Sequence, residues 1–185
     1  MKKIYEYSFV VLSLLFILSI LFGKFMYGDF VFMSGDSVAP QAVKQAINNI
    51  KNHTGSFPYW FPFIFSGMPT VHSLLNINDY YYPHLIINYL HELGMPWFWN
   101  FIFHYLFAGF GMYSFLRYLK QSKLSSIFAA ILFSISPYMI AYLVHGHGSQ
   151  MMTAAYIPWV MLFLFKIHKQ TNIINFSLLA LLVGL

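Results

Sequence analysis

Five long apolar runs constrain the fold of this chain more than any other feature. In the first run, no charge follows Glu6, and roughly a dozen Leu, Ile, Val and Phe residues favour bilayer insertion by several kcal/mol. The complete runs are near the twenty residues that a helix needs to cross a bilayer. Because the fifth run stops within a span, we expect one multi-span membrane domain that is the N-terminal part of a longer protein. The predicted spans are residues 5–22, 96–118, 125–144, 151–167 and 173–185.

Composition agrees with this class. Hydrophobic residues make up 59% of the chain, charged residues 8%, and the mean hydropathy is +0.63. Soluble domains are about half apolar and a quarter charged. The absence of Cys excludes a disulfide framework and a thiolate metal site. The basic residues are scattered rather than clustered, so nucleic acid is not an expected partner. The sequence therefore predicts an all-α polytopic membrane protein.

The positive charges are distributed unequally between the two sides of the predicted membrane domain. Seven basic residues fall on the side of the N-terminus and three on the side of the long loop 23–95. Cytoplasmic loops carry the excess of Lys and Arg, so we expect a cytoplasmic N-terminus and an outer loop 23–95. The seven are Lys2, Lys3, Arg117, Lys120, Lys123, Lys166 and Lys169, and the three are Lys24, Lys44 and Lys51. No small-residue cleavage site follows the first span, which is typical of an uncleaved anchor.

The outer loop contains patterned segments. Pro40–Lys51 and Pro83–Leu93 each carry an apolar stripe at helical spacing and suit amphipathic helices lying along the membrane surface. Three prolines in 57–69 predict an extended, ordered, aromatic-rich loop. Its aromatics, which include Tyr59 and Trp60, either contact a sugar face or prenyl chain of a substrate or anchor the loop at the headgroup level.

Two loop carboxylates are candidates for chemistry. Asp36 lies between Gly35 and a predicted helix start, where the helix dipole favours its ionised form. An ionised carboxylate there can take a proton from an acceptor hydroxyl or hold a divalent cation. The alternative role of Asp36 is an ordinary helix cap. Asp79 is a second candidate for the catalytic site, with a simple turn aspartate as its alternative.

A second polar segment, residues 145–150, lies on the same predicted side. His145, His147 and Gln150 are candidates to contact the phosphate of a substrate, and the intervening glycines allow a tight turn. A polar turn between two spans is the alternative, and two histidines without a third ligand are weak evidence for zinc. His104, inside the second span, is expected to be packed and hydrogen-bonded.

Taken together, these segments resemble the N-terminal part of the bacterial YfhO-type membrane proteins, in the GT-C glycosyltransferase class. The resemblance covers about residues 35–165. The family usually shows Pro-x-Trp-Asn-Pro in the aromatic stretch, whereas this chain has Phe61 in place of the Asn. The stretches that carry the resemblance are Gly35–Ser37, Phe57–Pro69 and Gly146–Gln150 followed by Ala154–Trp159.

The resemblance implies a GT-C-like enzyme of the bacterial cytoplasmic (inner) membrane. Its donor would be a polyprenyl-phosphate-linked sugar, and its acceptor a cell-envelope polymer or glycolipid. By that analogy, Asp36 would activate the acceptor hydroxyl or help hold a divalent cation near the donor phosphate. The loop around His147 would contact the donor from the opposite side.

Two other functions fit the same pattern. A transporter or flippase for lipid-linked precursors would use the aromatic loop and amphipathic helices without making or breaking bonds. Ionisable residues facing a cavity within the spans would favour this function, and since His104 alone qualifies in the sequence, this argues mildly against it. An assembly subunit would instead use the aromatic loop as a partner surface.

Overall fold

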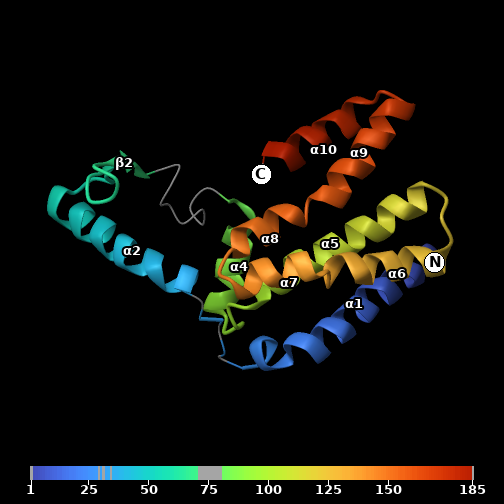
Figure 1. Ribbon diagram of the computed structural model, residues 1–185. Coiled ribbons are helices and arrows are strands. Elements are labelled where there is room, and N and C mark those ends of the chain that lie inside the picture. Colours follow the sequence, from blue (N-terminus) through green and yellow to red (C-terminus); the bar gives the residue numbers. More distant parts are fainter. Residues whose placement is uncertain (1, 29, 31, 34, 71–80, 185) are drawn as a thin grey trace.

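The computed structural model describes residues 2–28, 30, 32–33, 35–70 and 81–184, about three quarters of which are helical (Figure 1). The strands β1 (Trp60–Phe61) and β2 (Met68–Pro69) form one short antiparallel hairpin. The helices are α1 (Lys2–Met26), α2 (Gly35–Thr54), α4 (Pro83–Glu92), α5 (Trp99–Tyr118), α6 (Lys123–Ser134), α7 (Pro137–Val144), α8 (Gly148–Ala154), α9 (Ile157–Lys169) and α10 (Ile173–Gly184). The predicted all-α class is confirmed.

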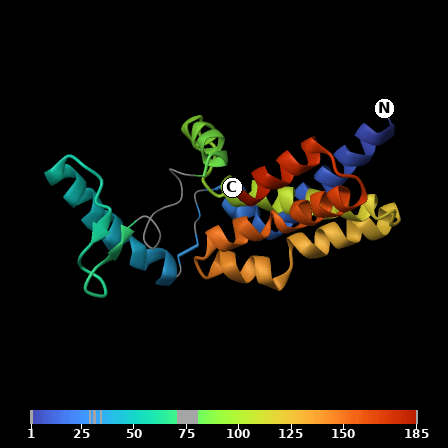
Figure 2. The ribbon, with the colours of Figure 1, turned by 90° about the horizontal axis from the view of Figure 1, so that it is seen from above.

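The helix α5 lies at the centre of the bundle and contacts α1, α6, α8 and α9 (Figure 2). Its buried face carries Ile102, Tyr105 and Ala108, which pack with Leu18 of α1 and Met139 of α7 in one hydrophobic cluster. This central position explains the composition of α5, because a helix surrounded by protein can carry His, Asn and Tyr where a lipid-facing helix cannot.

Two glycines allow neighbouring helices to approach α5 closely. A Cβ atom at Gly109 would lie 2.5 Å from Ser134 Oγ and 2.7 Å from Leu14 Cδ1. One at Gly111 would lie 2.5 Å from Trp159 Nε1. Small residues at such crossings are typical of helix packing in membranes, where close van der Waals contact replaces the hydrophobic effect as the attraction between helices.

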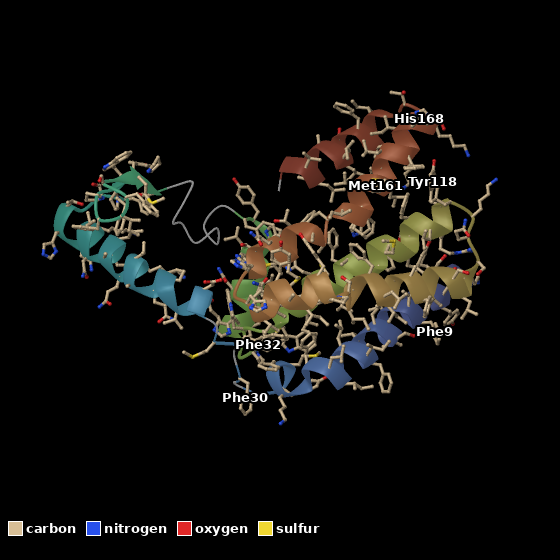
Figure 3. The ribbon with its side chains drawn as sticks, viewed as in Figure 1. Phe9, Phe30, Phe32, Tyr118, Met161 and His168 are labelled. Atoms are coloured by element: carbon tan, nitrogen blue, oxygen red, sulfur yellow. The ribbon has the colours of Figure 1, made fainter. Side chains whose placement is uncertain are left out.

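The outer faces of the helices are apolar. Phe9, 60% exposed, and Met161 are among the large apolar side chains on the surface of α1 and α9 (Figure 3). Among the described residues, three helical segments are long and apolar enough to cross a membrane: Ile4–Met26, Lys123–Val144 and Gly148–Lys169. The predicted spans 96–118 and 173–185 are not among them. The chain is therefore a membrane-embedded, multi-pass protein.

The boundaries of these segments differ from the predicted ones for identifiable reasons. The first helix continues past residue 22 to Met26 through a bend at Phe22, and Trp99 Nε1 donates to the Met26 carbonyl at 2.9 Å. The third span divides into α6 and α7 ahead of Pro137. The fourth begins earlier, at Gly148, and divides into α8 and α9 ahead of Pro158. Proline has no N–H to continue the ladder, so each break precedes one.

One end of the bundle holds the start of α1, the α5–α6 turn and the α9–α10 turn (Figure 1). There Glu6 of α1 forms an ion pair with Arg117, with 3.3 Å between Glu6 Oε1 and Arg117 Nε, and also contacts Lys123 and Tyr113. From the sequence, Arg117 and Lys123 served only to predict the orientation in the membrane, but their carboxylate partner ties α1 to both α5 and α6. The basic turns thus gather at one end, and the cytoplasmic location of that end stays a prediction.

The long loop forms an arm at the opposite end. The helix α2 leads away from the bundle and carries the hairpin at its far end (Figure 1). The predicted boundaries Pro40–Lys51 were too narrow, since α2 runs from Gly35 to Thr54 and contains Pro40 in its second turn. A proline so near the start costs the helix a single hydrogen bond. The helix α4 matches the prediction, with Pro83 in its first turn and Gly94 at φ +96° beyond its end.

The aromatic stretch 57–69 is ordered, as predicted, but it is a hairpin rather than an extended loop. Phe61 is buried, whereas Tyr59, Trp60 and Phe65 are exposed. Gly67, at φ +113°, would place a Cβ atom 2.5 Å from Trp60 Nε1. The short edge pairing tolerates the prolines that a central strand would not.

Candidate functional site

Asp36 and His147, predicted separately from the sequence, meet in the structure. Asp36 lies in the first turn of α2, and His147 is the residue just before α8. Asp36 Oδ2 is 3.2 Å from His147 Nε2. Their side chains are 64% and 45% exposed, so the pair contributes little to stability. Its consequence is positional: a carboxylate and an imidazole lie side by side at the end of the bundle where α2 begins, and both are accessible to a ligand.

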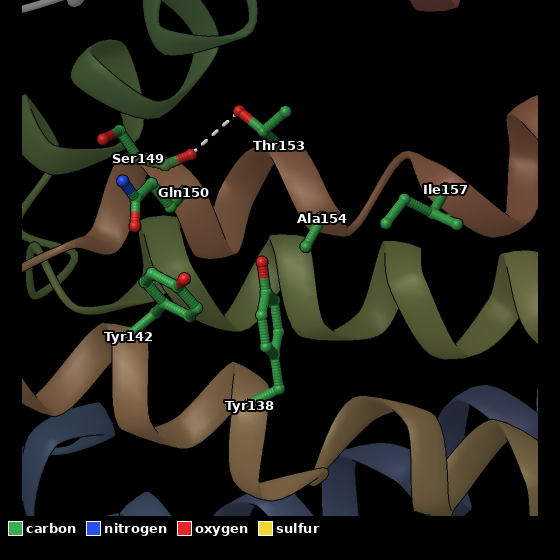
Figure 4. Close-up of a pocket in the computed structure, with 7 residues that line it drawn as sticks. All are labelled: Tyr138, Tyr142, Ser149, Gln150, Thr153, Ala154 and Ile157. Carbon is green, nitrogen blue, oxygen red and sulfur yellow. Dashed lines mark hydrogen bonds between the residues drawn. The ribbon is translucent and has the colours of Figure 1, made fainter.

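A pocket of about 420 Å³ lies between α7 and α8, on the same turn as His147 (Figure 4). Tyr138 and Tyr142 reach it from α7, and Ser149, Gln150 and Thr153 from α8. Ala154 and Ile157 complete its lining. Phenol rings beside hydroxyl and amide groups provide both stacking faces and hydrogen-bonding atoms, which is the chemistry that a sugar ring requires.

Two glycines shape the turn that presents His147. Gly146 adopts φ +91°, a left-handed conformation that residues with a side chain rarely take. Gly148 would place a Cβ atom 2.5 Å from Phe101 Cε1, so only glycine lets α8 start this close to α5. The His147 amide donates to the Tyr142 carbonyl at 2.8 Å, and the two rings lie 6.0 Å apart.

A buried polar network lies deeper, between α4, α5 and α9. His104 Nδ1 is 2.6 Å from the Asn100 carbonyl, and His104 Nε2 is 2.7 Å from Tyr81 Oη. Tyr81 Oη also contacts Tyr156 Oη. A carbonyl can only accept, so His104 donates from Nδ1, and Nε2 of the neutral ring accepts from Tyr81. His104 is thus packed and hydrogen-bonded, as predicted. Burial raises the pKa of the Tyr81 phenol well above its ordinary value.

A second buried polar pair joins Asn100 of α5 to His84 of α4. Asn100 Nδ2 lies 3.0 Å from His84 Nε2. Burial lowers the pKa of His84 below its ordinary value, although the Asn100 contact opposes this. Within the described ranges, His84 Nδ1 and Asn100 Oδ1 have no hydrogen-bond partner.

The structure places the remaining predicted site residues as follows. Gln150 lines the pocket beside His147, and His145 is exposed at the end of α7 in the same turn. Tyr59 and Trp60 lie on the hairpin at the far end of α2, a helix about 30 Å long at 1.5 Å per residue. The structure therefore does not bring these two aromatics to the Asp36–His147 pair. Asp79 lies outside the described residues.

The described residues contain no group of three or more His, Asp or Glu side chains placed to share an ion. At the Asp36–His147 pair they supply one carboxylate, whereas Mg²⁺ and Ca²⁺ take several oxygen ligands.

The sequence analysis did not identify the tyrosines that line the pocket beside His147 or those that join the buried network around His104. Tyr138 and Tyr142 are four residues apart on the helix that leads into the His147 turn, and this spacing places them on one face. That signal was available in the sequence. Tyr81 and Tyr156, in contrast, are brought together by packing between distant segments.

Comparisons with protein-family models, with curated proteins and with solved structures found no match to this chain.

Proposed function

We propose that this chain belongs to a GT-C-type membrane glycosyltransferase related to the YfhO-type proteins. The enzyme transfers a sugar from a polyprenyl-phosphate-linked donor to a cell-envelope polymer or glycolipid on the outer face of the bacterial cytoplasmic membrane. The observation that carries the proposal is the contact of 3.2 Å between Asp36 and His147, beside a pocket lined by phenol, hydroxyl and amide groups.

The two side chains of the pair have different roles: Asp36 takes the proton of the acceptor, and His147 orients the carboxylate. The Asp36 carboxylate uses Oδ2 for His147, so its Oδ1 is directed to the acceptor. The acceptor hydroxyl oxygen attacks the anomeric carbon of the donor sugar, and its proton passes to Asp36. The bond between the anomeric carbon and the phosphate oxygen breaks, and the polyprenyl phosphate leaves with the electron pair. General-base assistance of this kind contributes about 10²–10⁴-fold to rate.

His147 orients the carboxylate and, when protonated, attracts the phosphate of the donor. The sugar ring lies in the pocket between Tyr138, Tyr142 and Gln150. The first turn of α2 supports the arrangement, because the positive end of the helix dipole favours the ionised form of Asp36.

The direct test compares Asp36→Asn with the parent protein. Membranes that contain either protein receive a radiolabelled polyprenyl-phosphate sugar, and label in the envelope polymer and glycolipid fractions is measured. We expect transfer to fall at least a hundredfold while the amount of inserted protein is unchanged. Lys44→Gln, an exposed change on the same helix, is the matched control. Normal transfer by Asp36→Asn would exclude this role for Asp36.

One observation favours a second function, transport of a lipid-linked precursor. His104 lines an apolar groove within the helices together with Tyr81 and Tyr156. An ionisable residue facing a cavity inside a membrane domain is typical of a transport route. Purified protein in vesicles separates the two functions: movement of a labelled lipid between leaflets without new glycosidic product would favour transport.

A further inference from the structure

An apolar groove of about 490 Å³ lies between α4, α5 and α10. Its walls come from three helices: Ile86 and Leu90 of α4, Phe103 and Phe107 of α5, and Leu182 of α10. The polar atoms in its lining belong to Tyr81, His104 and Tyr156. A volume of this size is typical of small-molecule sites. In a membrane-embedded protein, a groove that is apolar along its walls and polar at one point suits a lipid.

The groove is adjacent to the polar pocket through a smaller cavity of about 150 Å³. This cavity shares Tyr81, Tyr156 and Leu182 with the groove, and Ser149 and Thr153 with the pocket beside His147. The three spaces therefore adjoin one another through shared lining residues. A molecule with an apolar chain in the groove would direct its headgroup toward the pocket.

The direction of the hydrogen bonds determines which headgroup fits. With the His104 ring neutral, the Tyr81 proton is directed to His104 Nε2. The Tyr81 oxygen then accepts a hydrogen bond from the Tyr156 hydroxyl, because the two hydroxyl groups are in contact. Because the Tyr156 hydroxyl donates its hydrogen bond to Tyr81, its oxygen presents only lone pairs to the cavity. It accepts a hydrogen bond from a ligand but does not donate one.

The Thr153 hydroxyl oxygen can likewise only accept a hydrogen bond from a ligand, for an independent reason. Its hydroxyl donates to the Ser149 carbonyl at 3.0 Å, so its oxygen also faces the cavity as an acceptor. The described residues that line the groove and the connecting cavity include no Lys or Arg. A phosphate group carries negative charge and accepting oxygens, so it would face these two acceptors. Ser149, which also lines the cavity, offers a hydroxyl donor but no positive charge. A hydroxyl group would find two partners.

We propose that the groove binds a lipid with a neutral, hydroxyl-bearing headgroup of the acylglycerol type, whose hydroxyl donates to Tyr156. The chain of the lipid lies between α4, α5 and α10. The identification of this lipid as the sugar acceptor rests on the proposed function, whereas the binding does not.

Two photoreactive probes with one common chain test the selectivity. The full chain, in nanodiscs of phosphatidylcholine, is titrated with monooleoylglycerol or oleoyl phosphate, each carrying a diazirine in the oleoyl chain. After illumination, labelled peptides are identified by mass spectrometry. We expect saturable labelling near Leu90, Phe103 and Leu182 by the glycerol probe, at lower concentration than by the phosphate probe.

Two variants test the two parts of the site. Tyr156→Phe removes the accepting oxygen and should weaken binding of the glycerol probe about three- to tenfold, the effect of one neutral hydrogen bond. It should leave the phosphate probe unaffected. Ile86→Trp, at a site that is 68% exposed, tests the groove without disturbing the core and should abolish labelling by both probes. Tyr118→Phe, a tyrosine at the opposite end of α5, is the matched control.

Equal or stronger labelling of the groove by the phosphate probe would overturn the proposed headgroup. Unchanged binding in Tyr156→Phe would overturn it as well, and unchanged labelling in Ile86→Trp would overturn the groove itself. No sugar donor is present in this experiment. Its failure is therefore distinguishable from a failure of the glycosyltransferase proposal, which depends on transfer by Asp36.

Discussion

Gly111→Ala offers a sharp test of the packing at the centre of the bundle. The new methyl carbon would lie 2.5 Å from Trp159 Nε1, well inside van der Waals contact. A shift of the indole would weaken two interactions. Its Nε1 donates to the Phe107 carbonyl at 2.9 Å, and its ring stacks on Phe107 with centroids 5.1 Å apart. The substitution must therefore separate α5 from α9 or break this hydrogen bond.

The expected cost follows from these two effects. Overpacking costs about 1–3 kcal/mol, and the lost hydrogen bond adds about 0.5–1.5 kcal/mol. We expect the free energy of unfolding to fall by about 2–4 kcal/mol. Equilibrium unfolding of the purified protein in mixed micelles, followed by tryptophan fluorescence and far-ultraviolet circular dichroism, measures this quantity.

Two controls isolate the contact. Gly23→Ala introduces the same methyl group inside α1, where the nearest atom is Tyr27 Cδ2 at 4.0 Å, and it should be neutral or slightly stabilising. Trp159→Phe removes the crowding atom, so the double variant should lose less stability than the sum of the single variants. A Gly111→Ala protein as stable as the Gly23→Ala protein would refute the close approach of α5 and α9.

The polar contacts at the two ends of the bundle give further predictions. Glu6→Gln removes the carboxylate that joins Arg117 and Lys123, so we expect a lower unfolding midpoint in mixed micelles, while Glu92→Gln, on the exposed end of α4, should leave the midpoint unchanged. Burial lowers the pKa of His84, so the unfolded chain takes up a proton first as the pH falls. The stability that His84 contributes is complete above the unfolded pKa of about 6.5 and is lost as the pH falls from there through the lower pKa of the folded protein. Unfolding of the parent and His84→Gln proteins between pH 8 and pH 5 checks this, and an equal pH dependence of the two would contradict it.

The candidate site was only partly predictable. Asp36 and His147 were each identified because an acid at a helix start and histidines between glycines are local signals in the sequence. Their contact was not predictable, because it depends on how α2 leaves the end of the bundle and where α8 begins. The role of Glu6 was missed for a similar reason, since its partners lie on two other helices.

Local sequence properties were enough to predict an all-α membrane protein and most of its helices. Hydropathy, helical period and proline position are local properties, and they act before any tertiary contact forms. They predicted three segments that could cross a membrane, the helix beginning at Pro83 and the glycine-rich turn at His147. The tertiary structure decided which polar groups meet: Asp36 with His147, Tyr81 with His104 and Tyr156, and Glu6 with Arg117. Those contacts join segments far apart in the chain, and they depend on close approaches, such as that at Gly111, which only the packed helices define.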